Sequence, residues 1–184
     1  MLRKFLLSNP FFGILLLLLL SSCFFGGVKN SGRVKSYQPG LVKTEKGFYK
    51  VGPLPESWQR TQIQSYKTIS FYNPQYKSTL MTDAFCDQSY DDASLKTLTT
   101  HLYFDLQDKK IQSQKQLMLN ERAAMRSIAQ GKVDGVPVVL DTLVIKKDWC
   151  LFDFALVADP AHYVEASKDF EDFYKGFEFE GALK

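Results

Sequence analysis

The sequence predicts an α+β domain in which one antiparallel β-sheet is covered by helices on both faces. The strongest β pattern is a hairpin made of residues 136–145 and 149–157 around a turn at 146–148. An antiparallel sheet with one face in water alternates apolar and polar residues. The second strand of this hairpin is largely apolar on both sides, with Cys150, Phe152, Phe154 and Leu156 on one and Trp149, Leu151, Asp153, Ala155 and Val157 on the other. We therefore expect a covered sheet.

Two stretches with apolar residues at helical spacing are the expected covers. The first follows the acidic pair Asp91-Asp92, which suits the positive end of a helix, and carries Leu95, Leu98, Leu102 and Leu106. The second spans residues 161–177 and carries an aromatic stripe, Phe170, Phe173, Tyr174 and Phe177. Such a stripe buries a large area per residue, so it indicates a core face.

Further strands are predicted at residues 48–51, 68–72, 78–86, 111–119 and 123–130. On the third of these, Leu80, Thr82, Ala84 and Cys86 share one side. The last contains good helix formers, which compete with its assignment as a strand. Residues 131–135, Gly-Lys-Val-Asp-Gly, have the composition of a turn.

The N-terminus predicts a lipoprotein signal peptide at residues 1–22. Arg3 and Lys4 precede an apolar run over residues 11–20, and Leu20-Ser21-Ser22-Cys23 follows. Ten helical residues reach about 15 Å, half of a bilayer core, so a cleaved signal fits better than a membrane-spanning anchor. The four residues are similar to the bacterial lipobox, which implies acyl chains on Cys23. A plain signal peptide with a nearby cysteine is the alternative.

Residues 23–45 are expected to form a lipidated flexible tether and residues 46–184 a single α/β domain. Residues 24–50 hold six Lys and Arg against one acid, whereas residues 51–184 hold fifteen against nineteen. A basic tether beside a lipid anchor would be attracted to anionic headgroups, although a simple soluble linker has the same composition. The domain lacks the basic face that nucleic-acid binding requires. Phe24, by the enterobacterial sorting rule, favours the outer membrane, facing the periplasm.

The cysteine count predicts one disulfide. If Cys23 carries lipid, Cys86 and Cys150 remain in a compartment that permits disulfides. Closing a loop of about 65 residues would stabilise the fold by up to about 4 kcal/mol. Two buried thiols are the alternative.

Several short motifs between residues 85 and 177, about half of the chain, carry a family resemblance: Leu98-Thr99-Thr100-His101-Leu102, Asn120-Glu121-Arg122-Ala123-Ala124, Val133-Asp134-Gly135-Val136-Pro137, Cys150-Leu151-Phe152-Asp153-Phe154 and Asp169-Phe170-Glu171-Asp172-Phe173. The chain resembles a group of uncharacterised proteobacterial lipoproteins and, more distantly, the PsbP/DcrB-like α/β/α sandwich. Photosystem and envelope roles in that fold imply binding or assembly. These motifs concern packing and turns, so no functional residue is transferred.

No catalytic, metal-binding or cofactor-binding motif is present in the sequence, and we expect no cofactor and no metal. One arrangement suggests a site. A three-residue turn at 146–148 would place Asp141 opposite Asp153, and two close carboxylates raise one pKa and can bind Ca²⁺ or act as acid and base. The alternatives are that Lys, Arg or helix N-terminal amides meet these carboxylates, or that the register differs by one residue. His101, in the Leu-rich helix, is expected to be a partly buried structural residue.

The leading hypothesis is a non-catalytic envelope lipoprotein that binds a protein partner or supports an assembly. An enzyme or small-ligand carrier with a cleft near Asp141, Asp153 and His101 is the alternative. A third hypothesis is lipid handling by the aromatic C-terminal helix, which burial of Phe170, Phe173 and Phe177 would contradict.

Overall fold

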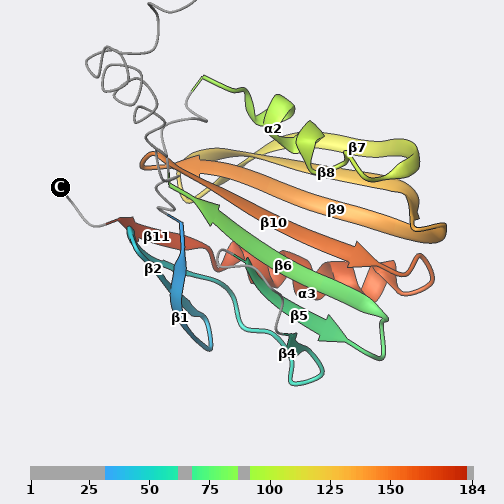
Figure 1. Ribbon diagram of the computed structural model, residues 1–184, viewed down its shortest axis with the longest axis horizontal. Coiled ribbons are helices and arrows are strands. Elements are labelled where there is room, and N and C mark those ends of the chain that lie inside the picture. Colours follow the sequence, from blue (N-terminus) through green and yellow to red (C-terminus); the bar gives the residue numbers. More distant parts are fainter. Residues whose placement is uncertain (1–31, 62–67, 87–91, 182–184) are drawn as a thin grey trace, which may run out of the picture.

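The computed structural model describes residues 32–61, 68–86 and 92–181, which form two antiparallel sheets and two helices (Figure 1). The elements are β1 (Val34–Gln38), β2 (Leu41–Thr44), β3 (Gly47–Lys50), β4 (Gln59–Thr61), β5 (Thr68–Asn73), β6 (Ser78–Phe85), α2 (Leu95–His101), β7 (Gln107–Leu119), β8 (Arg122–Val133), β9 (Val136–Lys147), β10 (Cys150–Ala158), α3 (Tyr163–Lys175) and β11 (Glu178–Gly181). The predicted signal peptide and Cys23 lie outside the described residues.

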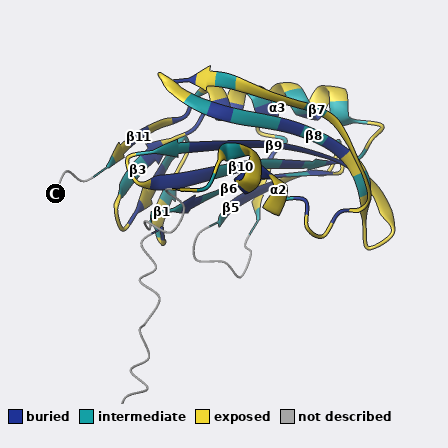
Figure 2. Ribbon diagram, turned by 90° about the horizontal axis from the view of Figure 1, so that it is seen from above, coloured by how far each residue is buried: buried dark blue, intermediate teal, exposed yellow. Residues whose placement is uncertain are grey.

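The larger sheet has seven strands in the order β4-β5-β6-β10-β9-β8-β7, and the smaller one has four in the order β1-β2-β3-β11. The main core lies between one face of the seven-stranded sheet, α3 and the four-stranded sheet. Its largest buried side chains include Tyr49, Phe152, Phe154, Phe173 and Phe177. Figure 2 shows the buried residues concentrated along β9 and β10, while β7 is largely exposed.

The opposite face of the seven-stranded sheet is covered by less material. Leu98 of α2 packs there on Val144 and Leu151. Beyond the helix, Tyr103 and Leu106 pack with a second group of sheet residues, Ala129, Val138 and Leu140. Both faces of β10 are therefore covered, as its apolar pattern predicts.

The predicted α/β/α sandwich with helices over both faces is nevertheless wrong. The described part of the chain is mostly β, and α2 has only 7 residues, too few to cover the sheet. On the other face α3, with 13 residues, shares the cover with the four-stranded sheet. The apolar pattern of a strand predicts that its face is covered, but it does not predict whether a helix or a second sheet covers it, because either can bury apolar residues.

The tether boundary also changes. Residues 34–44, which we assigned to the tether, form β1 and β2, joined at Pro39-Gly40, where Gly40 has a φ of 79°. Pro followed by Gly is typical of a tight turn, because Pro fixes φ and Gly accepts a positive φ. Val42 and Thr44 of β2 are buried, so folded structure begins well before residue 46.

Both predicted helices are present but shorter than expected. Ser94 caps α2 by accepting a hydrogen bond from the Thr97 amide, in the role that we gave to the acidic pair. The helix ends at His101, and Leu106 lies in the turns that follow. The predicted strand at residues 123–130 is confirmed within β8, where pairing with both β7 and β9 outweighs the helix propensity of its Ala and Met residues.

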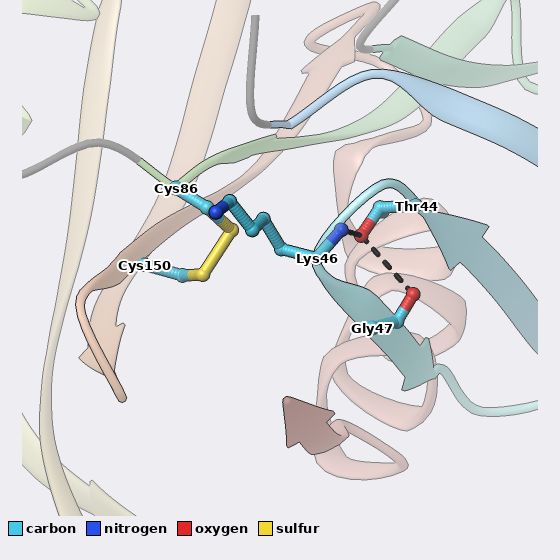
Figure 3. Close-up of a disulfide and its surroundings, with 5 residues drawn as sticks. All are labelled: Thr44, Lys46, Gly47, Cys86 and Cys150. Carbon is cyan, nitrogen blue, oxygen red and sulfur yellow. Dashed lines mark hydrogen bonds between the residues drawn. A yellow bond between two sulfur atoms is a disulfide. The ribbon is translucent and has the colours of Figure 1, made fainter. Parts of the chain in front are cut away.

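The predicted disulfide is present. Cys86, directly after β6, is bonded to Cys150 at the start of β10, with a Cα–Cα distance of 4.0 Å (Figure 3). It joins strands that are already neighbours and closes a loop with a sequence separation of 64 residues. No helix among the described residues is long and apolar enough to cross a membrane.

Candidate functional site

The register of the β9–β10 hairpin separates the two aspartates that the sequence analysis placed together. The turn consists of two residues, Asp148 and Trp149, with φ values of 51° and 65°. Two positive φ values are typical of the type I′ turn, whose twist matches that of paired strands. Asp141 therefore pairs with Leu156, and Asp153 pairs with Val144. The prediction that Asp141 lies opposite Asp153 is wrong.

The two carboxylates lie on opposite faces of the sheet. The observed partner of Asp141 lies three residues after the predicted one, Asp153. Because successive residues of a strand point to alternate faces, a shift by an odd number of residues places the two aspartates on opposite faces. Asp141 contacts groups on the α3 side, whereas Val144, the partner of Asp153, packs under α2. No single cleft can use both.

Asp141 is fully buried and forms an ion pair with Arg126 of β8. Nε of Arg126 donates to Oδ1 of Asp141 at 3.1 Å, and Nη2 donates to Oδ2 at 2.8 Å. The Tyr163 hydroxyl of α3 donates to the same Oδ2 at 2.9 Å. The alternative in which a basic group meets Asp141 is thus correct.

The remaining nitrogen of Arg126 connects this pair to α3. Nη1 donates to Glu171 at 3.2 Å and to the Tyr174 hydroxyl at 3.1 Å. Burial of the guanidinium lowers the pKa of Arg126, but the hydrogen bonds and charge of Asp141 outweigh it and raise that pKa. Burial is also the main cause that raises the pKa of Tyr163. The network holds α3 on the sheet, and breaking such a buried pair is costly.

A different carboxylate pair lies on the other face. Asp153 of β10 is directly opposite Asp83 of β6. Burial, followed by the charge of Asp83, raises the pKa of Asp153 to about 7. Oδ1 of Asp153 is buried without a hydrogen-bond partner among the described residues, while the Thr68 hydroxyl donates to Asp83.

Asp83 was missed by the sequence analysis. The pattern of residues 78–86 does contain a signal, because the alternation that puts Leu80, Thr82 and Ala84 in the core puts Asp83 on the other face. Finding its partner requires the pairing of β6 with β10, two strands that are far apart in the sequence. The idea of two close carboxylates with one raised pKa is correct for Asp153, with Asp83 as its neighbour.

The arrangement offers a carboxyl group that changes charge near neutral pH. Within the described ranges, no group of three or more His, Cys, Asp or Glu residues could hold a metal ion. His101 is exposed at the end of α2, not partly buried as expected, and among the described residues no hydrogen bond or ion pair joins it to Asp141 or Asp153. The three residues of the predicted cleft therefore do not form one site.

Burial of the aromatic stripe counts against the hypothesis of lipid handling by the C-terminal helix. Phe170, Phe173 and Phe177 are at most 1% exposed and belong to the main core. A lipid could reach them only if α3 left the sheet.

Comparison with known proteins shows likeness in fold. No family model and no curated protein sequence matches the chain. Among solved structures, cyanobacterial PsbP (CyanoP) from Synechocystis sp. PCC 6803 has a TM-score of 0.52 at 13% identity, covering 88% of this chain and 99% of that one. LpqN, involved in cell envelope biogenesis of Mycobacterium tuberculosis, has a TM-score of 0.51 at 13% identity, and the match covers 72% of this chain and 84% of LpqN. A Bacteroides thetaiotaomicron protein has a TM-score of 0.52 at 14% identity, and the match covers 82% of this chain and 49% of that protein.

These likenesses support a PsbP-like fold. At such low identity they show the fold alone and transfer no residue role. The resemblance to the lipoprotein group is not shown by them.

Proposed function

We propose that the chain is a lipid-anchored protein of the bacterial cell envelope that acts as a non-catalytic binding or assembly factor. In this proposal residues 1–22 are a signal peptide and Cys23 carries the lipid. The observation that supports it best is the disulfide between Cys86 and Cys150. The chain has three cysteines, so this pairing leaves Cys23 alone, directly after the apolar run and the small residues that precede it.

The disulfide also agrees with an oxidising compartment, since cytosolic proteins rarely keep such bonds. The structural neighbour LpqN, involved in cell envelope biogenesis, is compatible with this assignment. Phe24 after the proposed lipid site favours the outer membrane, with the domain in the periplasm and an envelope protein as partner.

The alternative function, a catalytic or ligand-binding cleft built from Asp141 and Asp153, loses its basis. The first carboxylate is fully engaged by Arg126 and Tyr163, and the second lies on the other face. A binding role therefore has to use the surface of the domain.

Metabolic labelling with palmitate tests the anchor. The full-length chain, expressed in a bacterial host, is expected to incorporate the label and to sediment with membranes. The Cys23→Ser chain should lose the label, and a Cys86→Ser/Cys150→Ser chain should retain it, because neither cysteine of the disulfide is an acylation site. Absence of label from the unaltered chain, or label that persists in Cys23→Ser, would contradict the proposal.

A further inference from the structure

One end of the seven-stranded sheet carries an exposed tryptophan among basic residues. Trp149, in the β9–β10 turn, is 69% exposed, and its positive φ of 65° is uncommon for a bulky side chain. The β7–β8 turn, at Asn120-Glu121, lies at the same end (Figure 1). With 69% of its surface exposed, Trp149 contributes little buried area to the fold.

The surroundings of Trp149 are cationic. A surface hollow of about 160 Å³ is lined by Trp149, Arg122, Lys146 and Lys147, with Asp148 as its one acid. Arg122 lies 3.5 Å from Asp148, and Lys146 donates to the carbonyl oxygen of Ala93 at 2.8 Å.

The disulfide lies beside this hollow, since Cys150 is part of its lining. Figure 3 shows the Lys46 side chain, from the β2–β3 turn, extended toward the disulfide. We call Lys46, Arg122, Lys146, Lys147 and Trp149 the basic tip. Three cations and one acid line the hollow. The other acids near the tip are Glu121 of the β7–β8 turn, Glu45 beside Lys46, and Glu178, which interacts electrostatically with Lys147.

The N-terminal end of the described chain lies at the same place. Gly32 packs so closely on β6 that a Cβ there would overlap the carbonyl oxygen of Ala84. β6 ends at Phe85, and the next residue, Cys86, is bonded to Cys150. Eight residues lie between Cys23 and Gly32, so the Cα atoms of these two residues can be at most about 30 Å apart. A lipid on Cys23 would therefore keep this end of the domain close to the membrane.

We propose that the basic tip is a membrane-contact surface that binds anionic phospholipid headgroups. This inference rests on the proposed function, because the lipid on Cys23 determines which end faces the bilayer. Tryptophan is favoured at the headgroup level, where its ring is partly buried and its N–H remains hydrated. Lysine and arginine within a Debye length of an anionic leaflet are attracted to it. The end of the seven-stranded sheet that carries the basic tip would then face the membrane.

Quenching of tryptophan fluorescence by brominated lipid tests the contact. The chain has two tryptophans, and Trp58 is 6% exposed, so it serves as an internal reference. The full chain, recovered from bacterial membranes, is reconstituted in vesicles of phosphatidylethanolamine and brominated phosphatidylglycerol. We expect quenching that is absent in the Trp149→Phe chain and absent in vesicles of brominated phosphatidylcholine at physiological salt.

Charge variants at the two ends of the sheet provide a matched comparison. Replacing Lys146 and Lys147 by Gln should reduce the equilibrium constant for tip contact about 30-fold, at roughly 1 kcal/mol per cation. Replacing Lys109 and Lys110 by Gln, an adjacent exposed pair on β7 roughly 25 Å or more along the sheet, should leave quenching unchanged. The proposal would be overturned if both charge variants were quenched to the same extent, or if the unaltered chain showed no quenching.

The mass of the same sample separates this proposal from the proposed function. A lipidated chain whose Trp149 is not quenched refutes the basic tip and leaves the anchor intact. A chain without lipid refutes the anchor, and the tip is then tested by adding that chain to preformed anionic vesicles. Binding that disappears in the Lys146→Gln/Lys147→Gln chain supports the tip, and binding that is unchanged refutes it.

Discussion

Replacing Asp153 by asparagine is expected to stabilise the protein at alkaline pH and to change its stability little at acidic pH. The folded state raises the pKa of this carboxyl from 3.8 to about 7, because burial and the nearby Asp83 disfavour its charged form. A raised folded-state pKa in an acid means that the folded protein binds the proton more tightly than the unfolded chain. The carboxylate therefore lowers stability progressively as the pH rises from about 4 to about 7.

The magnitude follows from the two pKa values. At 1.36 kcal/mol for each pH unit, the change from 3.8 to about 7 corresponds to about 4 kcal/mol of lost stability above pH 7. Asparagine has almost the same shape and no charge, and its amide can donate to Asp83. We expect the stability difference between Asp153→Asn and the unaltered chain to grow from near zero at about pH 4 to about 4 kcal/mol at about pH 8.

Urea unfolding at several pH values measures this difference. The exposed Asp105, mutated to Asn, serves as the control and should show the same pH dependence as the unaltered chain. If Asp153→Asn gives a stability difference that does not vary with pH, or destabilises the protein at alkaline pH, the burial argument for this carboxyl is refuted.

Three further changes test the packing. Arg126→Met should lower the free energy of unfolding by about 3–5 kcal/mol, because it leaves Asp141 buried without its ion-pair partner, and adding Asp141→Leu should recover much of the loss; urea unfolding of the single and double variants decides. The Cys86→Ser/Cys150→Ser chain should lose about 4 kcal/mol, and alkylation of the unaltered chain before reduction should find both thiols blocked. Gly52→Ala should lower the free energy of unfolding by at least about 1–3 kcal/mol, because the added Cβ would overlap the backbone of α3. Thermal unfolding would show a lower Tm.

The parts of the fold that follow from local pattern were predictable. Alternation in β10 and in residues 78–86 predicts which residues face the core, and the aromatic stripe of α3 is buried as expected. β1 and β2 were missed although Pro39-Gly40 between Tyr37 and Val42 is a readable turn signal, because the surrounding Lys, Ser and Gly residues resemble a linker.

The candidate site depended on features that local pattern does not determine. Asp148-Trp149 is not a preferred type I′ pair, since that turn favours Asn-Gly or Asp-Gly, so a two-residue turn had no sequence signal. One change in turn length moved Asp141 to the other face, where Arg126 neutralises it. The pair of Asp83 with Asp153 arises from strands that meet only through the order of the whole sheet.

The intact mass of the mature protein shows directly whether Cys23 is its lipidated first residue. The full-length chain is expressed in a bacterial host, extracted from membranes with detergent and analysed by mass spectrometry with N-terminal fragmentation. We expect a chain that begins at Cys23, carries acyl chains on this residue and retains the disulfide between Cys86 and Cys150. A chain that retains residues 1–22, or that begins elsewhere with an unmodified Cys23, would contradict this expectation.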